Sequence, residues 1–175
     1  AAHALGAKHF DGSMVGSCKF SVMTGFSFHP VKSIAAGEGG MITTNNYDIY
    51  KTLLRLRSHG INKLDDAFIN KELSSTKGTP NPWYYEMQEL GYNYRITDIQ
   101  CALGLSQLKK LGKFIERRKD LVNYYDIAFK EFKNLNPIQI KHRDLSSHHL
   151  YVVRINFDKI RESRATLMKK LSENG

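Results

Sequence analysis

A single lysine between two segments with strand-forming side chains is the feature that most constrains this 175-residue chain. Residues 24–28 and 41–44 are rich in β-branched and aromatic side chains, so each is expected to form a strand. Lys32 lies between them, after a His-Pro turn and before a glycine-rich loop. An amine held by strands and loops in an apolar environment is a nucleophile that can form a Schiff base with a carbonyl compound.

The surroundings of Lys32 also offer groups that could contact a phosphate. Ser27 supplies a hydroxyl, and the glycines Gly37, Gly39 and Gly40 leave backbone amides accessible. These glycines do not form the G-x-G-x-x-G pattern, so a dinucleotide site is poorly supported. The residues alone leave a second interpretation open, in which Lys32 is an ordinary surface lysine at a turn.

The composition is that of a folded protein. Hydrophobic residues make up 41% and charged residues 25% of the chain, which is enough apolar material for a core. No apolar run is long enough to span a membrane, and residues 1–9 do not resemble a signal peptide. Cys18 and Cys101 form no C-x-x-C pair and fit unpaired thiols in a reducing, cytoplasmic setting. Because the sequence lacks an initiator methionine, we expect a fragment of a longer protein.

The net charge of +9 raises the alternative of a nucleic-acid-binding module. The basic pairs and triplets at 109–110, 117–119 and 169–170 fall on expected helices, however, and no basic tail or aromatic platform accompanies them. Solvated helix faces, with a contribution from an anionic substrate, explain the charge better, and no nucleic-acid partner is expected. A nucleic-acid binder would show steep salt dependence. His3, His9 and Asp11 match no zinc or iron spacing, so no metal site is expected.

The order of strand-like and helix-like segments predicts an α/β domain followed by the start of a second one. Residues 1–7 are expected to form a short helix or loop, and residues 18–28 one or two strands. A helix is predicted over 47–58, with Asn46 able to cap its start and Gly60 as the residue after its C-cap. Residues 61–90 are expected to form a long loop excursion. The side chains of its aromatic end, W-Y-Y-E-M, should be packed against other residues and not exposed to solvent.

Further helices are predicted on both sides of Gly112. Thr97 should cap the first of them, and the second should run to about residue 132. After a polar linker over 134–147, a buried strand is expected over 150–155 and a last helix from residue 158. The residues expected on buried helix faces are Ile99, Ala102, Leu103, Leu105, Ser106, Leu108, Phe114, Leu121, Tyr124, Tyr125, Ala128, Phe132, Ile160, Leu167, Met168 and Leu171.

Five segments resemble the DegT/DnrJ/EryC1/StrS family of nucleotide-sugar aminotransferases, which depend on pyridoxal 5'-phosphate (PLP). The longest, S-F-H-P-V-K-S-I-A-A-G-E-G-G-M-I-T-T-N at 27–45, is similar to the lysine segment of the family. The others, in the order of the family, are A-A-H-A-L-G-A at 1–7, R-S-H-G-I at 57–61, L-G-Y-N-Y-R-I-T-D-I-Q at 90–100 and H-L-Y-V-V-R at 149–154. The resemblance therefore extends over nearly the whole chain.

The resemblance implies a role for four residues in binding the cofactor. Lys32 stands at the Schiff-base lysine, which also moves protons between substrate and cofactor. Ser27 matches the serine that contacts the cofactor phosphate, and His3 matches a residue beside the pyridoxal ring; its alternative is a structural capping histidine. Asn93 matches an asparagine that reaches the cofactor of the neighbouring subunit, which implies a homodimer with shared active sites.

Two further residues are implied in substrate binding. His149 falls where the family has a histidine close to the sugar nucleotide. Arg95 stands where it could contact substrate phosphates, with a structural ion pair as the alternative. The aspartate that pairs with the pyridine nitrogen in the family would precede Ala1, so the sequence lacks it.

The fold implied by the resemblance is part of the type I PLP-dependent transferase fold, which is also that of aspartate aminotransferase. Residues 1–112 would be the later part of the large domain, and 113–175 a connecting helix with the first strand and helix of the small domain. The segment at 83–111 is most similar to enzymes of pseudaminic acid synthesis. That similarity implies transfer of an amino group from glutamate to C4 of a UDP-linked 4-keto-6-deoxy-N-acetylhexosamine. Another nucleotide-ketosugar and an inactive fragment remain alternatives; a sugar dehydratase of the family would carry histidine in place of Lys32.

Overall fold

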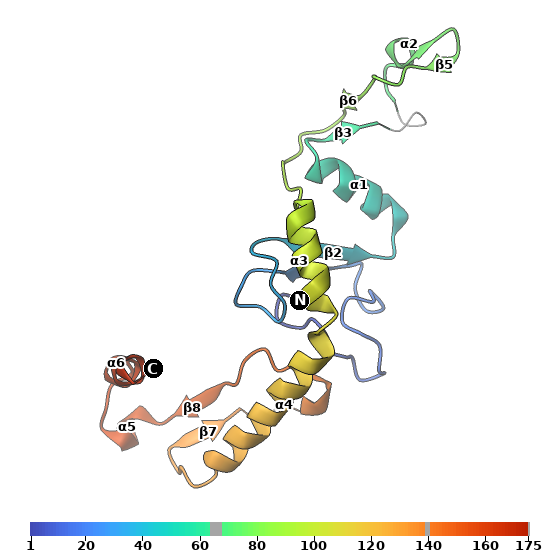
Figure 1. Ribbon diagram of the computed structural model, residues 1–175. Coiled ribbons are helices and arrows are strands. Elements are labelled where there is room, and N and C mark those ends of the chain that lie inside the picture. Colours follow the sequence, from blue (N-terminus) through green and yellow to red (C-terminus); the bar gives the residue numbers. More distant parts are fainter. Residues whose placement is uncertain (64–67, 139–140, 175) are drawn as a thin grey trace.

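The computed structural model describes residues 1–63, 68–138 and 141–174 of an elongated α/β chain (Figure 1). A hairpin of strands β1 and β2 lies in the middle, with helix α3 beside it. The segment from β3 to β6 extends to one end, and α4 leads to β7, β8, α5 and α6 at the other. Every sheet within the described residues is a two-stranded antiparallel ribbon.

Strands β1 (Met23–Ser27) and β2 (Gly40–Thr44) form the central hairpin, as the strand-forming residues on both sides of Lys32 predict. Their register pairs Met23 with Thr44 and Ser27 with Gly40. Residues 18–22 do not join this strand, because the backbone of Cys18 is left-handed at φ 57° and turns the chain. The expected 18–28 segment therefore contains one strand, and it is shorter.

The core is built around side chains of the loop that carries Lys32. Phe28, Ile34 and Ala36 are buried there, and partly buried Leu5, Phe26, Ile96 and Leu111 pack against them. These side chains come from the N-terminal segment, the hairpin, the turn before α3 and the start of α4. The burial of Phe28, Ile34 and Ala36 therefore ties four separate parts of the chain to one loop.

Helix α1 (Tyr47–Arg57) forms where it was predicted, with the Asn46 side chain accepting hydrogen bonds from two backbone amides of its first turn. Its C-cap is Ser58, so His59, at φ 64°, and not Gly60 is the first residue after the cap. Gly60 is required for another reason: an added Cβ would lie 1.8 Å from the carbonyl oxygen of Glu89. A glycine at this position lets residues 89–91 pack against the end of α1.

The excursion over 61–90 contains short paired segments that were not predicted. Strand β3 (Ile61–Asn62) pairs with β6 (Glu86–Met87), and β4 (Ser75–Thr76) pairs with β5 (Thr79–Pro80) after the short helix α2 (Lys71–Ser74). The prediction that the aromatic end is covered is wrong for two of its rings: Trp83 is 71% exposed and Tyr85 is 57% exposed. Only Tyr84 packs edge-on against Phe68, at 4.9 Å between ring centroids. The predicted excursion also includes 64–67, which lie outside the described residues.

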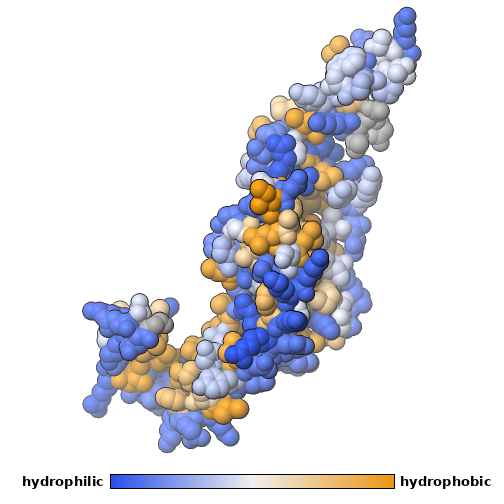
Figure 2. All heavy atoms as spheres, in the orientation of Figure 1, coloured by the Kyte–Doolittle hydropathy of each residue, from blue (hydrophilic) through white to orange (hydrophobic). Residues whose placement is uncertain are grey.

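Helix α3 (Asp98–Leu108) starts as predicted, with a capping box between Thr97 and Gln100. Its predicted buried face is wrong, because none of its residues is buried and Ile99 is 84% exposed. Two of its contacts are with the lysine loop: Gly104 lies against Ala36, and Gln100 donates to the Glu38 carbonyl. No element of the described chain covers its outer apolar side chains, and apolar residues gather in this region of the surface (Figure 2).

Helix α4 (Leu111–Ala128) ends before the predicted residue 132. Val122 is its only fully buried residue, so Leu121, Tyr124 and Ala128 were wrongly predicted to be buried. Phe132 lies beyond the helix and is also exposed. Tyr125, at 38% exposed, still packs against Phe129 and Tyr151. These rings join α4 to the C-terminal part of the chain.

The C-terminal part differs from the prediction in three respects. The linker contains β7 (Leu135–Pro137) and a 3₁₀ turn, η2 (Arg143–Leu145), while its residues 139–140 lie outside the described chain. The expected 150–155 strand is shortened to β8 (Val153–Ile155), which pairs with β7. It was expected to be buried, but Leu150 and Val152 are exposed, because this ribbon has only two strands.

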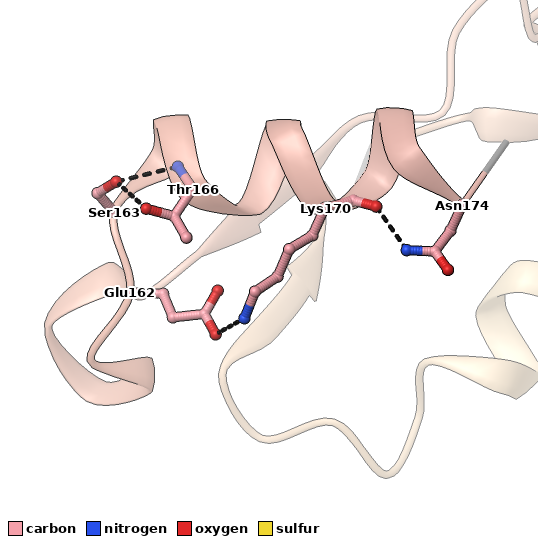
Figure 3. A network of polar contacts seen from close by, with 5 residues as sticks. All are labelled: Glu162, Ser163, Thr166, Lys170 and Asn174. Carbon is pink, nitrogen blue, oxygen red and sulfur yellow. Dashed lines mark hydrogen bonds and ion pairs between the residues drawn. The ribbon is translucent and has the colours of Figure 1, made fainter.

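The predicted last helix is broken into α5 (Phe157–Ile160) and α6 (Arg164–Glu173). Arg161 adopts a left-handed conformation at φ 55° and ends α5. Ser163 then caps α6, and Lys170 forms an ion pair with Glu162 across the junction (Figure 3). Met168 and Leu171 are each 58% exposed, so their predicted inward position is wrong. No helix in the described part of the chain is long and apolar enough to cross a membrane.

The small core allows a matched test of stability. Phe28→Ala removes a side chain that is 9% exposed and should lower the free energy of unfolding by about 3 kcal/mol. Ile99→Ala, at a position 84% exposed, should change it by less than about 0.5 kcal/mol. Urea denaturation followed by circular dichroism measures both. Equal losses in the two variants would contradict the position of the core.

Candidate active site

The amine of Lys32 is presented by the loop between β1 and β2. The backbone amide of Lys32 donates to the His29 carbonyl at 2.9 Å, and the amide of Ala36 donates to the Phe28 carbonyl at 3.0 Å. Ser33 and Ile34, which follow Lys32, are buried, whereas Lys32 itself is partly exposed. The loop is therefore anchored by its apolar side chains while its amine stays accessible.

His3 lies directly beside this amine. Its Nε2 atom is 2.8 Å from Lys32 Nζ, which is hydrogen-bond distance. A protonated amine donates this bond to an unprotonated Nε2, and a neutral amine can accept it from Nε2–H. The N-terminal segment is held in place by the backbone nitrogen of Ala1, which donates to the Gly25 carbonyl at 2.8 Å. The arrangement allows a proton to pass between the amine and the imidazole.

His149 packs on the other side of His3. The two ring centroids are 4.2 Å apart, with 35° between the ring planes. The Nδ1 atom of His149 is buried and has no hydrogen-bond partner in the described chain. Burial lowers the pKa of His149 from its ordinary value of 6.5, and the charges of His3, Arg118 and Lys32 lower it further. His149 is thus a neutral imidazole at neutral pH.

Ser27 ends β1 on the same loop as Lys32. It is half-buried, and its hydroxyl oxygen accepts a hydrogen bond from the His29 amide at 3.4 Å. Its partner in the hairpin is Gly40, where an added Cβ would lie 2.5 Å from the carbonyl oxygen of Phe26. The close approach of the two strands beside Ser27 therefore requires a glycine at this point.

Asn93 and Arg95 are not joined to this cluster by any hydrogen bond or ion pair among the described residues. Both side chains are exposed, and Asn93 forms an isolated β-bridge with Ser58. Arg95 takes part in none of the ion pairs in the described ranges, so the structural ion pair considered for it is not observed. Its neighbour Ile96 packs in the core next to Gly39, which places this segment beside the lysine loop.

Two residues that the sequence reasoning did not select support the cluster. Ser147 is 1% exposed and donates from its hydroxyl to the His3 carbonyl at 3.2 Å. Arg118 donates to the carbonyls of His148 and His149 at 3.2 and 2.9 Å. Serines and arginines of this kind carry no motif, and only their contacts in the folded chain reveal them. No group of three or more potential metal ligands occurs in the described part of the chain.

The sequence pattern of the DegT/DnrJ/EryC1/StrS aminotransferase family matches residues 1–175. The chain therefore belongs to this family of PLP-dependent sugar aminotransferases. The predicted α/β fold is likewise confirmed, because the chain superimposes on part of the structures of PLP-dependent aminotransferases.

Three relatives illustrate this similarity. The chain is 40% identical, over 87% of its length, to the UDP-4-amino-4,6-dideoxy-N-acetyl-beta-L-altrosamine transaminase of Campylobacter jejuni, and spans 36% of that protein. The structure of PseC from Helicobacter pylori, an aminotransferase of pseudaminic acid biosynthesis, matches all of the chain with a TM-score of 0.82 and 30% identity. The chain spans 42% of that structure.

The third relative is GDP-4-keto-6-deoxy-D-mannose-3-dehydratase from E. coli, with bound hydrated PLP. It matches 100% of the chain with a TM-score of 0.76 and 28% identity, and the chain spans 43% of it. The fold of this chain thus occurs in both aminotransferases and a dehydratase. The fold therefore does not determine which of the two reactions is catalysed, and that distinction depends on the residues of the site.

The environment of His149 leads to a prediction about its titration. Because burial and three neighbouring groups disfavour its charged form, its imidazole should titrate below the ordinary pKa of 6.5. Lys32→Met removes one of the positive charges and should move the midpoint upward. Nuclear magnetic resonance of the ring protons measures both values. A midpoint at or above 6.5 in the unsubstituted chain would contradict the burial of His149 against His3.

Proposed function

We propose that this chain is part of a PLP-dependent enzyme that transfers the amino group of glutamate to C4 of a UDP-linked 4-keto-6-deoxy-N-acetylhexosamine. The observation that carries this proposal is the 2.8 Å contact between Lys32 and His3, within a chain of a sugar aminotransferase family. The similarity to the Campylobacter jejuni transaminase, at 40% identity, supports the choice of sugar. The enzyme is proposed to be cytoplasmic, as is typical of this family.

The residues present fit the cofactor. Lys32 offers an amine for its aldehyde, and Ser27 offers a hydroxyl on the same loop for its phosphate. The buried Nδ1 of His149, whose ring packs on His3, and the buried hydroxyl of Ser33, the residue after Lys32, both lack partners in the described chain. We propose that Lys32, Ser27, His3 and Asn93 bind the cofactor, Asn93 from a second copy of the chain.

When bound, PLP supplies an aldehyde that an amine can capture and a ring that withdraws electrons from the bond being broken. Lys32 holds the cofactor and is the group that moves protons to and from the reacting carbon. His3 accepts a proton from the Lys32 amine, or returns it, through the contact at 2.8 Å. His149 keeps His3 in place with a neutral ring, so that it adds no positive charge that would repel the protonated amine.

The proposed substrate and second subunit rest on charge and on the exposure of two side chains. Arg95 and His149 would bind the sugar nucleotide, whose phosphates a chain of net charge +9 attracts. The exposure of Asn93 and Arg95 leaves both side chains accessible to a second copy of the chain, as a homodimer with shared sites requires. Residues 1–112 are proposed to belong to the large domain and 113–175 to lead into the small one.

Two alternatives within the family concern the substrate and the fragment. In the first alternative, another nucleotide-ketosugar takes the amino group, since the contacts described around Lys32 do not distinguish one sugar stereoisomer from another. The chain taken alone could be inactive, because it spans only 36% of the Campylobacter enzyme. The dehydratase alternative is disfavoured by Lys32 itself, and a nucleic-acid-binding module by the spread of its basic residues.

The proposal is tested with the full-length protein, glutamate and a panel of UDP-, GDP- and dTDP-linked ketosugars. Release of 2-oxoglutarate beyond one equivalent per enzyme should depend on a UDP-linked 4-keto-6-deoxy-N-acetylhexosamine, because the ketosugar has to take the amino group before a second glutamate can react. Lys32→Arg keeps the charge but should lower the rate on the order of a thousandfold, because the proton-transferring amine is lost. Lys113→Arg, at an exposed position of α4, is the matched control and should keep the full rate. Full activity of Lys32→Arg, or no amino transfer to any sugar, would rule the proposal out.

A further inference from the structure

The turn that carries His149 has a strained backbone. His148, which precedes it, is left-handed at φ 50°, a conformation that side chains larger than glycine rarely adopt. The His148 amide donates to the Ser146 hydroxyl at 3.1 Å, which closes a local turn. Such a conformation persists only where the surrounding structure holds it, so residues 146–149 must be anchored by contacts from outside the turn.

Arg118 on α4 provides one of these anchors. Its Nη1 nitrogen donates to the carbonyl of His148 at 3.2 Å and to that of His149 at 2.9 Å. Two consecutive carbonyl oxygens can face one nitrogen only because the backbone turns at His148. Hydrogen bonds from a guanidinium are charge-assisted, and Arg118 is partly buried, so they are stronger than bonds between neutral groups in water.

The N-terminal segment provides the second anchor. The Ser147 hydroxyl donates to the His3 carbonyl, and the Lys8 amide donates to the Leu145 carbonyl at 2.9 Å. Because Ser147 is 1% exposed, water cannot readily replace its bond to His3. The turn is therefore fixed between α4 on one side and the segment that carries His3 on the other. This is the arrangement that brings the two imidazole rings to 4.2 Å.

We propose that Arg118 is a positioning residue of the candidate site: by holding the carbonyls of His148 and His149, it keeps the His149 ring on His3 and His3 on Lys32. The geometric part of this inference concerns the chain alone, and its meaning for catalysis rests on the proposed function. We call the two hydrogen bonds from Arg118 to the carbonyls of His148 and His149 the clamp. Because Arg118 lies in α4 and Lys32 in the hairpin loop, the clamp joins the two proposed domains at the amine. A change at α4 is thereby transmitted to the environment of the cofactor amine.

The charge of Arg118 has a second effect at the same place. The groups that face His149 are His3, Arg118 and Lys32, and the charged form of each disfavours a protonated His149. Arg118 therefore holds the ring in position and also helps to keep it neutral. Loss of the clamp would expose the ring to water and remove one charge, and both changes raise the pKa of His149.

The test compares Arg118→Met with Arg117→Met in the complete chain. Arg117 is the exposed neighbour on α4, so this control removes the same charge from the same helix. Nuclear magnetic resonance follows three signals: the cross-peak between the ring protons of His3 and His149, the titration of His149, and a cross-strand peak between Thr24 and Thr43 of the hairpin. The last signal reports folding of a region that Arg118 does not contact.

Arg118→Met should lose the ring cross-peak and raise the midpoint of His149 toward 6.5, with the hairpin peak retained. Arg117→Met should leave all three signals unchanged. A ring cross-peak that persists in Arg118→Met, or that disappears equally in Arg117→Met, overturns the proposal. If Arg118→Met unfolds the hairpin, Arg118→Gln gives the same test, because its amide nitrogen lies two bonds closer to the backbone than Nη1 of Arg118 and carries no charge. A weakened ring cross-peak then supports the clamp, and one of full strength overturns it.

A fourth readout separates this inference from the proposed function. Borohydride fixation of PLP should be weaker in Arg118→Met than in Arg117→Met. If the unsubstituted full-length protein fixes no PLP, the proposed function is wrong. The ring cross-peak in Arg118→Met and Arg117→Met then still tests the positioning role of Arg118. If fixation is normal in all variants and the ring cross-peak persists, the clamp fails and the proposed function stands.

Discussion

The burial of Phe28, Ile34 and Ala36, three residues of the loop that carries Lys32, is the interaction on which the rest of the structure depends. This small core receives Leu5 from the N-terminal segment, Ile96 from the turn before α3 and Leu111 from the start of α4. Each of these side chains brings a segment that carries a site residue close to the loop. His3 precedes Leu5, Arg95 precedes Ile96, and Arg118 follows Leu111 on the same helix. Packing of apolar side chains thus gathers polar groups that are far apart in the sequence.

The polar contacts at the site divide into those that touch the amine and those that hold its neighbours. His3 touches Lys32, and His149 touches His3. Ser147 and Arg118 hold the backbone of these histidines from two directions. A lysine on a loop would otherwise sample many conformations, and the histidine pair restricts it at one face. The same contacts make the neutral form of His149 the favoured one, because its ring is buried next to positive groups.

Much of the local structure follows from the sequence. The capping side chains Asn46 and Thr97 fix the starts of α1 and α3, and the strand-forming residues around Lys32 produce the hairpin. Burial was harder to predict, because amphipathic spacing identifies a face and says nothing about whether another element covers it. Ile99 and Leu105 have the right spacing and remain exposed, in a chain that spans 36% of the Campylobacter relative. The break after α5 was missed because Arg161 has no sequence signal for its left-handed backbone.

The candidate site was predictable only in part for a related reason. The resemblance to the family pointed to Lys32, His3 and His149, and the structure brings these three together. Ser27 lies on the same loop, whereas Asn93 and Arg95 make no hydrogen bond or ion pair to the cluster among the described residues, and their roles stay predictions. Arg118 acts through backbone carbonyls, which every residue possesses, so no pattern of side chains could have identified it.

The most direct measurement of the central claim, that Lys32 is the amine that holds the cofactor, is the position at which borohydride fixes PLP. The full-length protein is incubated with PLP, reduced, digested and analysed by mass spectrometry. We expect a visible absorption band that disappears on reduction and a single pyridoxyl group on the peptide that contains Lys32. A label on a different lysine, or no label on the full-length protein, would contradict it.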